Sequence, residues 1–355
     1  MPTGSVGKSE KGGKGAAALV LLAVGLLLAA AACGSSSSAS TSPVTLRLGY
    51  YPNITHGTAL VGVQEGIFAK ALGPDKLDAS KTFNAGPAEA TALITGSIDV
   101  AFIGPSPSIN AFTKSHGAVQ IVSGAASGGA GLVVKPSITS VADLKGKTIA
   151  TPQLGNTQDV ALRSFLKSHG LKTDLQGGGD VSIKPQENSQ TLLTFKQGSI
   201  DGAWVPEPYM SQLVVQDGGR LLVDEKQLWP NGQWDTTNVL VSTSFLKAHP
   251  STVKRFLEGL VETVASIKSD PTGAKAAMNE QLASLSGKKL PDSVLNAAFA
   301  NLTFTVDPIA SSLVKQAADA VSVGLLTSPQ LRGIFNPTTL NQVLKEKGQA
   351  QVASS

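Results

Sequence analysis

One seven-residue segment occurs twice in this chain, and the repeat constrains the fold more than any other feature. Residues 96–102 read GSIDVAF and residues 198–204 read GSIDGAW, so five of the seven positions are identical. Each copy follows a helix-like stretch, at residues 88–95 and 189–197, and each runs into a proline-broken loop. The shared order of helix, turn, strand and loop predicts two similar α/β lobes, each presenting a loop at a strand end. Chance recurrence of a common helix-to-strand connector is the alternative.

The patterns around the repeat predict how the two lobes are connected. Residues 45–50 alternate apolar and polar side chains like a strand, and residues 238–242 predict another strand, after which helical patterns continue to the C-terminal region. We therefore expect a discontinuous first lobe, residues 44–132 plus 239–352. A second lobe, residues 133–238, is inserted within it, and two crossover strands form the hinge.

The N-terminal residues predict a secretion leader with a lipid attachment site. Residues 1–32 combine a lysine-containing start with a run of Ala, Leu and Val, which is typical of a signal peptide. Cys33, the only cysteine, follows three alanines, in a context that resembles a bacterial lipobox with Ala30 where leucine is preferred. The serine-rich residues 33–43 indicate a flexible tether. We expect cleavage before Cys33 and lipid anchoring to the outer face of a bacterial cell membrane; an ordinary secretory signal or an uncleaved anchor is the alternative.

Charge and side-chain composition exclude several other classes of protein. Without residues 1–32 the chain has 29 − 3 = 26 basic and 25 − 1 = 24 acidic residues, which is too balanced for a nucleic-acid binder. No second cysteine is present to form an intrachain disulfide. The four histidines, at positions 56, 116, 169 and 249, have no paired spacing typical of a metal site. We expect neither a metal nor a cofactor.

Several short motifs resemble the solute-binding proteins of ABC importers for nitrate, taurine and alkanesulfonates, a group that also contains binders of thiamine-pyrimidine precursors. In chain order they are YYPNITH at 50–56, GIFAK at 66–70, DLKGK at 143–147, TPQLGNT at 151–157 and WVPEP at 204–208. The resemblance implies an α/β type II periplasmic-binding fold, in which two lobes joined by a two-strand hinge close on one small solute. It also implies delivery of the solute to a membrane permease with its ATPase subunit.

The resemblance leaves the solute and some alternative functions open. The first expectation is a small anionic or zwitterionic solute, such as taurine or another alkanesulfonate, ahead of nitrate or bicarbonate. A thiamine-pyrimidine precursor is the alternative solute.

An enzyme is the main alternative to a binding protein, because the same superfamily includes sulfinate-processing and pyrimidine-synthesising members. We expect no enzyme, since the mature chain has no cysteine nucleophile beyond Cys33, and no nucleophile elbow or paired-carboxylate motif stands out. A lipoprotein that only adheres or signals is a third reading. We expect a monomer.

Aromatic residues with a polar tip mark the predicted ligand site. The three tyrosines of the chain, Tyr50, Tyr51 and Tyr209, all fall in the loops predicted to line the cleft, and Trp204 lies close to the third. Such side chains suit a pocket that is apolar yet forms hydrogen bonds with its ligand. We expect Tyr51, Trp204 and Tyr209 to face the ligand. Tyr50 continues an inward strand pattern and is expected in the core.

Two helix N-termini are expected to hold an oxyanion without a formal positive charge. A helix N-terminus offers free N–H groups and a favourable dipole to an anion. Asn156 and Thr157 open one such helix, and Pro105, Ser106 and Ser108 open the other. Ordinary N-capping explains these residue types equally well.

The remaining candidates are polar residues that would discriminate between solutes. Glu207, between two prolines, favours a ligand with an ammonium or another donor; alternatively it accepts hydrogen bonds from loop N–H groups near the hinge. His56 and Asn53 lie in the first loop, where His56 either contacts the solute or caps the next helix. Arg47 and Arg163 are expected on the solvated surface.

Overall fold

The structure, a computed structural model, describes residues 42–329 and 331–353. The predicted leader, the lipidation site Cys33 and most of the predicted tether lie outside these residues. Residues 43–355 form one compact unit. Among the described residues, every helix is too short or too polar to cross a membrane.

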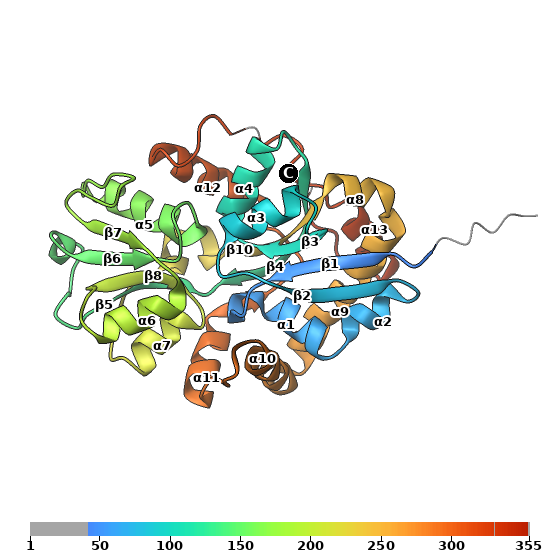
Figure 1. Cartoon of the computed structure of the whole chain (residues 1–355), viewed down its shortest axis with the longest axis horizontal. Coiled ribbons are helices and arrows are strands. Elements are labelled where there is room, and N and C mark those ends of the chain that lie inside the picture. The colour runs from blue at the N-terminus through green and yellow to red at the C-terminus, as the bar shows by residue number, and fades with distance from the viewer. Residues whose placement is uncertain (1–41, 330, 354–355) are drawn as a thin grey trace, which may run out of the picture. The chain divides into compact units, whose positions relative to one another are not determined.

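Two mixed sheets organise the chain (Figure 1). The first, in the order β11-β4-β10-β3-β1-β2, contains β1 (Thr45–Tyr50), β2 (Lys76–Thr82), β3 (Val100–Ile103), β4 (Val119–Gly128), β10 (Asp235–Ser242) and β11 (Leu302–Phe304). The second, in the order β7-β6-β8-β5-β9, contains β5 (Ala130–Val134), β6 (Thr148–Thr151), β7 (Ser182–Pro185), β8 (Gly202–Pro206) and β9 (Arg220–Asp224). We call each sheet with its helices the first and the second lobe. The α/β class is confirmed.

Helices cover both sheets. The first lobe contains α1 (Gly57–Gln64), α2 (Ile67–Leu72), α3 (Gly86–Ile94), α4 (Pro105–Lys114), α8 (Thr243–Ala248), α9 (Pro250–Ser269), α10 (Pro271–Ser286), α11 (Asp292–Ala300), α12 (Ala310–Ser322) and α13 (Thr338–Glu346), with the short 3-10 helix η1 (Ile54–His56). The second contains α5 (Thr157–Ser168), α6 (Asn188–Lys196) and α7 (Tyr209–Val215), with η2 (Ala142–Leu144), η3 (Glu225–Leu228) and η4 (Pro230–Gly232). Proline stands in the first turn of α3, α4, α9 and α10, where its missing N–H costs no helical hydrogen bond.

The two copies of the sequence repeat adopt the same local structure. Gly96 and Gly198 both have positive φ, at 74° and 76°, and end the preceding helix. Ile98 and Ile200, two residues later, are both buried. The strands that follow, β3 and β8, each pair in parallel with a neighbour, β1 and β6 respectively. The echo in the sequence is therefore an equivalence in the structure.

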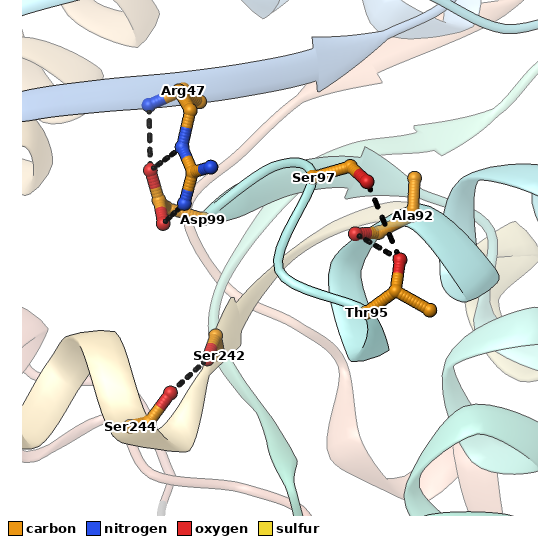
Figure 2. Close-up of polar contacts among 7 residues, drawn as sticks. All are labelled: Arg47, Ala92, Thr95, Ser97, Asp99, Ser242 and Ser244. Carbon is orange, nitrogen blue, oxygen red and sulfur yellow. Dashed lines mark hydrogen bonds and ion pairs between the residues drawn. The ribbon is translucent and has the colours of Figure 1, made fainter.

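The aspartate of each copy connects its strand to that parallel neighbour. Asp99 accepts hydrogen bonds from the backbone N–H of Arg47 at 2.9 Å and from its guanidinium Nε and Nη2 at 2.9 and 2.6 Å, as Figure 2 shows. Asp201 accepts from the backbone N–H of Thr148 at 2.9 Å and from Lys135 Nζ at 3.0 Å. The Arg47 side chain is 40% exposed, as expected of a surface residue, but it is also ion-paired. We call this arrangement the aspartate clamp.

The chain crosses between the sheets twice. The first crossing is Gly128–Gly129, with φ of 90° and 72°, between β4 and β5. The second is the segment of η3 and η4 between β9 and β10. The boundary expected after Leu132 therefore lies inside β5, and the boundary expected before Val239 lies inside β10. The apolar sequence pattern continues through β5 and does not mark the boundary between the lobes. Two glycines with positive φ form that boundary instead.

Replacing Gly128 tests the first crossing. A Cβ there would meet the carbonyl oxygen of Asn301 at 2.6 Å, in addition to the cost of a positive φ. We expect Gly128→Ala to lower the free energy of unfolding by more than about 2 kcal/mol, because left-handed backbone alone costs about 1–2 kcal/mol. The matched control is Gly146→Ala, with φ of 74° and open space around its Cβ, which should lose only the roughly 1–2 kcal/mol of the left-handed backbone itself. Urea unfolding measures both, and equal losses would contradict a tight crossing.

Candidate functional site

A small polar cavity lies where loops of the two lobes meet. We call it the cleft site. Its lining comprises Tyr51, Asn53, Thr55, His56, Asn84, Gly104, Thr236 and Thr237 from the first lobe and Asn156, Thr157, Gln158, Asn188 and Pro206 from the second. Its volume is about 20 Å³, which is close to the space that one water molecule needs. The lobes therefore stand close together around it.

The cleft site lies at the carboxyl ends of parallel strands, which explains why these loops meet. Tyr51 follows β1 and Gly104 follows β3, and these two strands are parallel neighbours. In the second lobe, Pro206 ends β8 and Asn156 lies in the loop after β6, again parallel neighbours. Ligands of open α/β sheets bind at such strand ends.

Three helices begin at the cleft site. α4 of the first lobe has Gly104 as its N-cap residue, while α5 and α6 of the second have Asn156 and Glu187. None of these residues caps its helix through a side-chain hydrogen bond. A Cβ built on Gly104 would lie 2.5 Å from Thr157 Oγ1, so the N-termini of α4 and α5 face each other. Their dipoles and free N–H groups favour an anion here.

Several polar atoms at the cleft site are buried without a hydrogen-bond partner. They are Tyr51 Oη, Thr157 Oγ1, Asn188 Oδ1 and Thr237 Oγ1. All four residues are at most 6% exposed. Buried polar groups in folded proteins are nearly always paired, and an unpaired one costs about 1–3 kcal/mol. Tyr51 Oη lies beside the Glu89 carboxyl, so the atoms of Thr157, Asn188 and Thr237 are the ones that indicate a site built to hydrogen-bond a ligand.

The described residues that line the cleft site include no lysine, arginine, aspartate or glutamate. His56 is buried, which lowers its pKa to about 3 and keeps the ring neutral. The backbone N–H of Tyr51 donates to His56 Nδ1 at 3.3 Å, which leaves the ring proton on Nε2, and the two rings lie 4.1 Å apart. The favourable potential for an anion therefore comes from the helix N-termini.

Glu89 of α3 lies in the interior next to Tyr51, and no sequence pattern pointed to it. Burial raises the pKa of Glu89 well above its usual value, and burial likewise raises the pKa of Tyr51, with the Glu89 carboxyl as a second cause. Both carboxyl oxygens of Glu89 are buried, and the Tyr51 hydroxyl lies close enough to affect the pKa of the carboxyl. A protonated Glu89 adds no negative charge beside the cleft. A lone acidic residue in the first turn of a helix gave no signal for this, because such residues usually face solvent.

The structure brings together some of the residues expected from sequence. Tyr51, Asn53, His56, Asn156 and Thr157 all line the cleft site. The side chain of His56 makes no cap hydrogen bond with the following helix. Contact of these residues with a ligand stays a prediction.

Trp204 and Glu207 are not where the sequence analysis expected them. Trp204 is fully buried in the second-lobe core, where its ring packs on Phe165 and its Nε1 donates to Glu225 at 2.7 Å. Its expected ligand-facing position is therefore wrong. Glu207 accepts hydrogen bonds from the N–H and hydroxyl of Ser211 at 3.0 and 2.8 Å and from Asn301 Nδ2 at 2.7 Å. This matches the alternative prediction, in which Glu207 accepts hydrogen bonds from donors near a crossing between the lobes.

The other expected residues lie outside the lining of the cleft site. Pro105 and Ser106 occupy the first turn of α4, and Ser106 Oγ is buried without a partner. Ser108 Oγ donates to the Gly104 carbonyl at 3.0 Å. Tyr209 opens α7 and lines a separate groove, where burial raises its pKa to about 12. These positions do not support direct ligand contact for Ser108 or Tyr209.

The residues that the sequence analysis missed come from elements far apart in the chain. Asn188 opens α6 much as Thr157 opens α5, so the second helix start in that lobe was a usable signal. Thr236 and Thr237 lie on β10, and no motif marks them.

Arg163, expected on the surface, is 1% exposed and pairs with Asp159 at 3.0 Å, so that expectation is wrong. Among the described residues, no cluster of three His, Cys, Asp or Glu side chains could hold a metal ion.

Comparison with known proteins agrees with this geometry. The model of the NMT1-like family matches residues 39–283. The taurine-binding periplasmic protein of Escherichia coli (strain K12) is 29% identical over 217 residues, covering 60% of this chain and 64% of the relative. This chain therefore matches less than two thirds of that relative's length.

Two solved structures show the same fold. The alkanesulfonate-binding protein SsuA from Xanthomonas axonopodis pv. citri, bound to MOPS, has a TM-score of 0.67 at 22% identity, covering 81% of this chain and 96% of its own. The periplasmic nitrate-binding protein NrtA from Synechocystis PCC 6803 has a TM-score of 0.71 at 16% identity, covering 86% and 89%. The expected type II periplasmic-binding fold is confirmed.

The buried His56 predicts a measurable pH dependence of stability. The unfolded chain takes up a proton on histidine near pH 6.5, whereas the folded chain does so only near pH 3. Between these values the unfolded state binds more protons, so the free energy of unfolding falls as the pH is lowered. Relative to His56→Gln, we expect the protein to lose about 1 kcal/mol per pH unit between pH 6 and pH 4.5. Urea unfolding at each pH measures this, and a constant difference would show that His56 is accessible to protons when folded.

Proposed function

Because the chain belongs to the NMT1-like family, we propose that it is the extracytoplasmic solute-binding protein of an ABC importer. It holds one small anionic or zwitterionic solute in the cleft site. The observation that carries this proposal is the convergence of α4, α5 and α6, with uncapped N-termini, on a cavity with unpaired hydroxyl groups. Helix dipoles and neutral donors hold an oxyanion without a buried cation.

A sulfonate is the solute class that we propose first. The names of the relatives reported above include taurine and alkanesulfonates, and a sulfonate presents three oxygens to donors from both lobes. Nitrate or bicarbonate is a smaller solute of the same charge, and it would need less widening of the cavity than a sulfonate. A thiamine-pyrimidine precursor stays the uncharged alternative. The relatives reported above are binding proteins by name, and we propose that this protein does not alter its solute.

Solute capture is coupled to the position of the lobes. The cleft donors come from both lobes, so a solute contacts all of them only when the lobes are close. At the cleft mouth, Asn84 Nδ2 donates to Glu187 Oε1 at 3.0 Å across the two lobes. A ligand shifts such an equilibrium by its difference in affinity for the two states. We propose that the crossings at Gly128–Gly129 and at η3–η4 absorb the movement.

The surroundings of the protein complete the proposal. Residues 1–32 are removed as a signal peptide, and Cys33 carries the lipid that holds the protein at the outer face of a bacterial membrane. The protein acts as a monomer, and a permease with its ATPase subunit receives the solute. The balanced charge of the chain supports a small solute as its ligand rather than nucleic acid.

Thr157→Val tests the proposal at one atom. The change removes a hydroxyl that has no partner in the protein and keeps the shape of the side chain. We expect the affinity for the solute to fall about 10- to 100-fold, since a hydrogen bond to a charged group contributes about 1.5–3 kcal/mol. Without solute, we expect the free energy of unfolding to stay the same or to rise by about 1 kcal/mol, because an unpaired buried hydroxyl is lost.

Isothermal titration with taurine, methanesulfonate, nitrate, bicarbonate and an aminopyrimidine measures the affinities. The matched control is Thr263→Val, because Thr263 is buried in α9 and its hydroxyl donates to the Gly259 carbonyl at 2.8 Å. This control should bind the solute like the parent and lose stability. Unchanged binding in Thr157→Val would remove the cleft site from the proposal. Consumption of a solute during the titration would favour the enzyme reading, and binding of none would favour the adhesion or signalling reading.

A further inference from the structure

A second cavity, much larger than the cleft site, lies along α5. Its volume is about 300 Å³. Its walls are α5 and η3 of the second lobe and α12 of the first. This size is at the lower end of the range for small-molecule sites. The space is ample for a molecule of about ten heavy atoms.

One wall of the cavity is aromatic and apolar. Phe165 and Val160 contribute from α5, and Trp229 contributes from the end of η3. The rings of Trp229 and Trp234 are nearly parallel, with centroids 6.1 Å apart, which holds the Trp229 ring in place. Lys315 Nζ lies 4.7 Å from the centre of the Trp229 ring. Lys315 therefore makes a cation–π contact with the Trp229 ring.

Two buried polar side chains that line the cavity, Glu225 and Gln316, present acceptor oxygens. Glu225 is 2% exposed, and one of its oxygens accepts from Trp204 Nε1 at 2.7 Å. Gln316 is 4% exposed; its amide donates to the Asp235 carbonyl at 3.2 Å, and its Oε1 is buried without a partner. A buried acceptor without a donor is costly, so a ligand that donates here is favoured. An aromatic wall combined with a carboxyl and an amide oxygen suits a molecule with a cationic donor group.

The charges around Glu225 are compatible with such a ligand. Burial raises the pKa of Glu225 to about 7, against the lowering effects of the hydrogen bonds from Trp204 and Trp229 and of the Lys315 charge. The carboxyl is thus easily ionised when a cation arrives. Lys315 pairs with Asp319 at 2.6 Å, and its side chain is 49% exposed. The Asp319 carboxylate therefore balances the charge of Lys315.

We propose that this cavity is a second ligand site, which binds a small apolar amine or amidine. The charged group lies between Glu225 and Gln316, and the apolar body packs on Phe165 and Trp229. The site is independent of the proposed solute-binding function, because none of these four residues lines the cleft site. A bound molecule touches both lobes, so it favours the arrangement in which they stand close together.

Intrinsic fluorescence tests the site directly, because the chain has only three tryptophans and Trp229 lines the cavity. We expect titration with 2-phenylethylamine to give a saturable change in emission. The uncharged analogue 2-phenylethanol should bind at least about tenfold more weakly, since it lacks the charge that pairs with Glu225. No saturable change with the amine at millimolar concentration would overturn the proposal, and so would equal binding of the two compounds.

Two variants assign the binding to this cavity. Glu225→Gln keeps the shape and an acceptor for Trp204, and we expect it to weaken amine binding at least about tenfold. Ser164→Phe places a ring in the cavity from a half-buried position of α5, and we expect it to abolish binding. The matched control is Glu258→Gln in α9, outside the cavity lining, which should bind like the parent. Unchanged binding in both cavity variants would overturn the proposal.

Discussion

The structure depends on the aspartate clamp that occurs once in each lobe. Asp99 and Asp201 each follow a Gly-Ser-Ile connector and accept a hydrogen bond from the backbone N–H of a neighbouring parallel strand. Each is also paired with a basic side chain, Arg47 or Lys135. Hydrogen bonds to charged groups contribute about 1.5–3 kcal/mol when they are shielded from water. The clamp therefore holds the strands in register at their beginnings and so aligns their ends, where the cleft loops leave the sheets.

The aligned strand ends allow an anion site without a buried cation. A buried lysine or arginine would have to lose its hydration whenever the lobes close, and an attached anion rarely repays that loss in full. Helix N-termini carry roughly half a positive charge each, and their N–H groups are fixed by the helices themselves. The unpaired hydroxyls of Thr157 and Thr237 cost free energy while the closed cleft is empty. The proposed site would therefore favour the closed arrangement mainly with its solute bound.

The sequence predicted the general position of the site better than its members. The repeat and the strand-end loops indicated where Tyr51 and Thr157 would lie, because carboxyl ends of parallel strands meet at one edge. Trp204 was wrongly expected to face the ligand. Side chains alternate between the two faces of β8, and Trp204 lies with its cross-strand partner Leu132 on the face that packs against α5. Arg163 was misplaced because a mid-helix arginine usually faces water, whereas Asp159 one turn earlier pairs with it in the interior. Thr237 carries no local signal, since only the tertiary fold brings β10 to the cleft.

Helix α5 contributes residues to both cavities and to hydrophobic clusters of both lobes. Its first residue, Thr157, lines both cavities, and Asp159 holds the preceding loop through the N–H of Gly155 at 2.9 Å. Val160 belongs to a hydrophobic cluster made otherwise of first-lobe residues, whereas Phe165 belongs to the second-lobe core. A movement of the lobes must therefore break the contacts of Val160 while the second-lobe contacts of Phe165 persist. Because α5 carries all these groups, a molecule at the proposed second site would contact the same interface between the lobes as a solute in the cleft site.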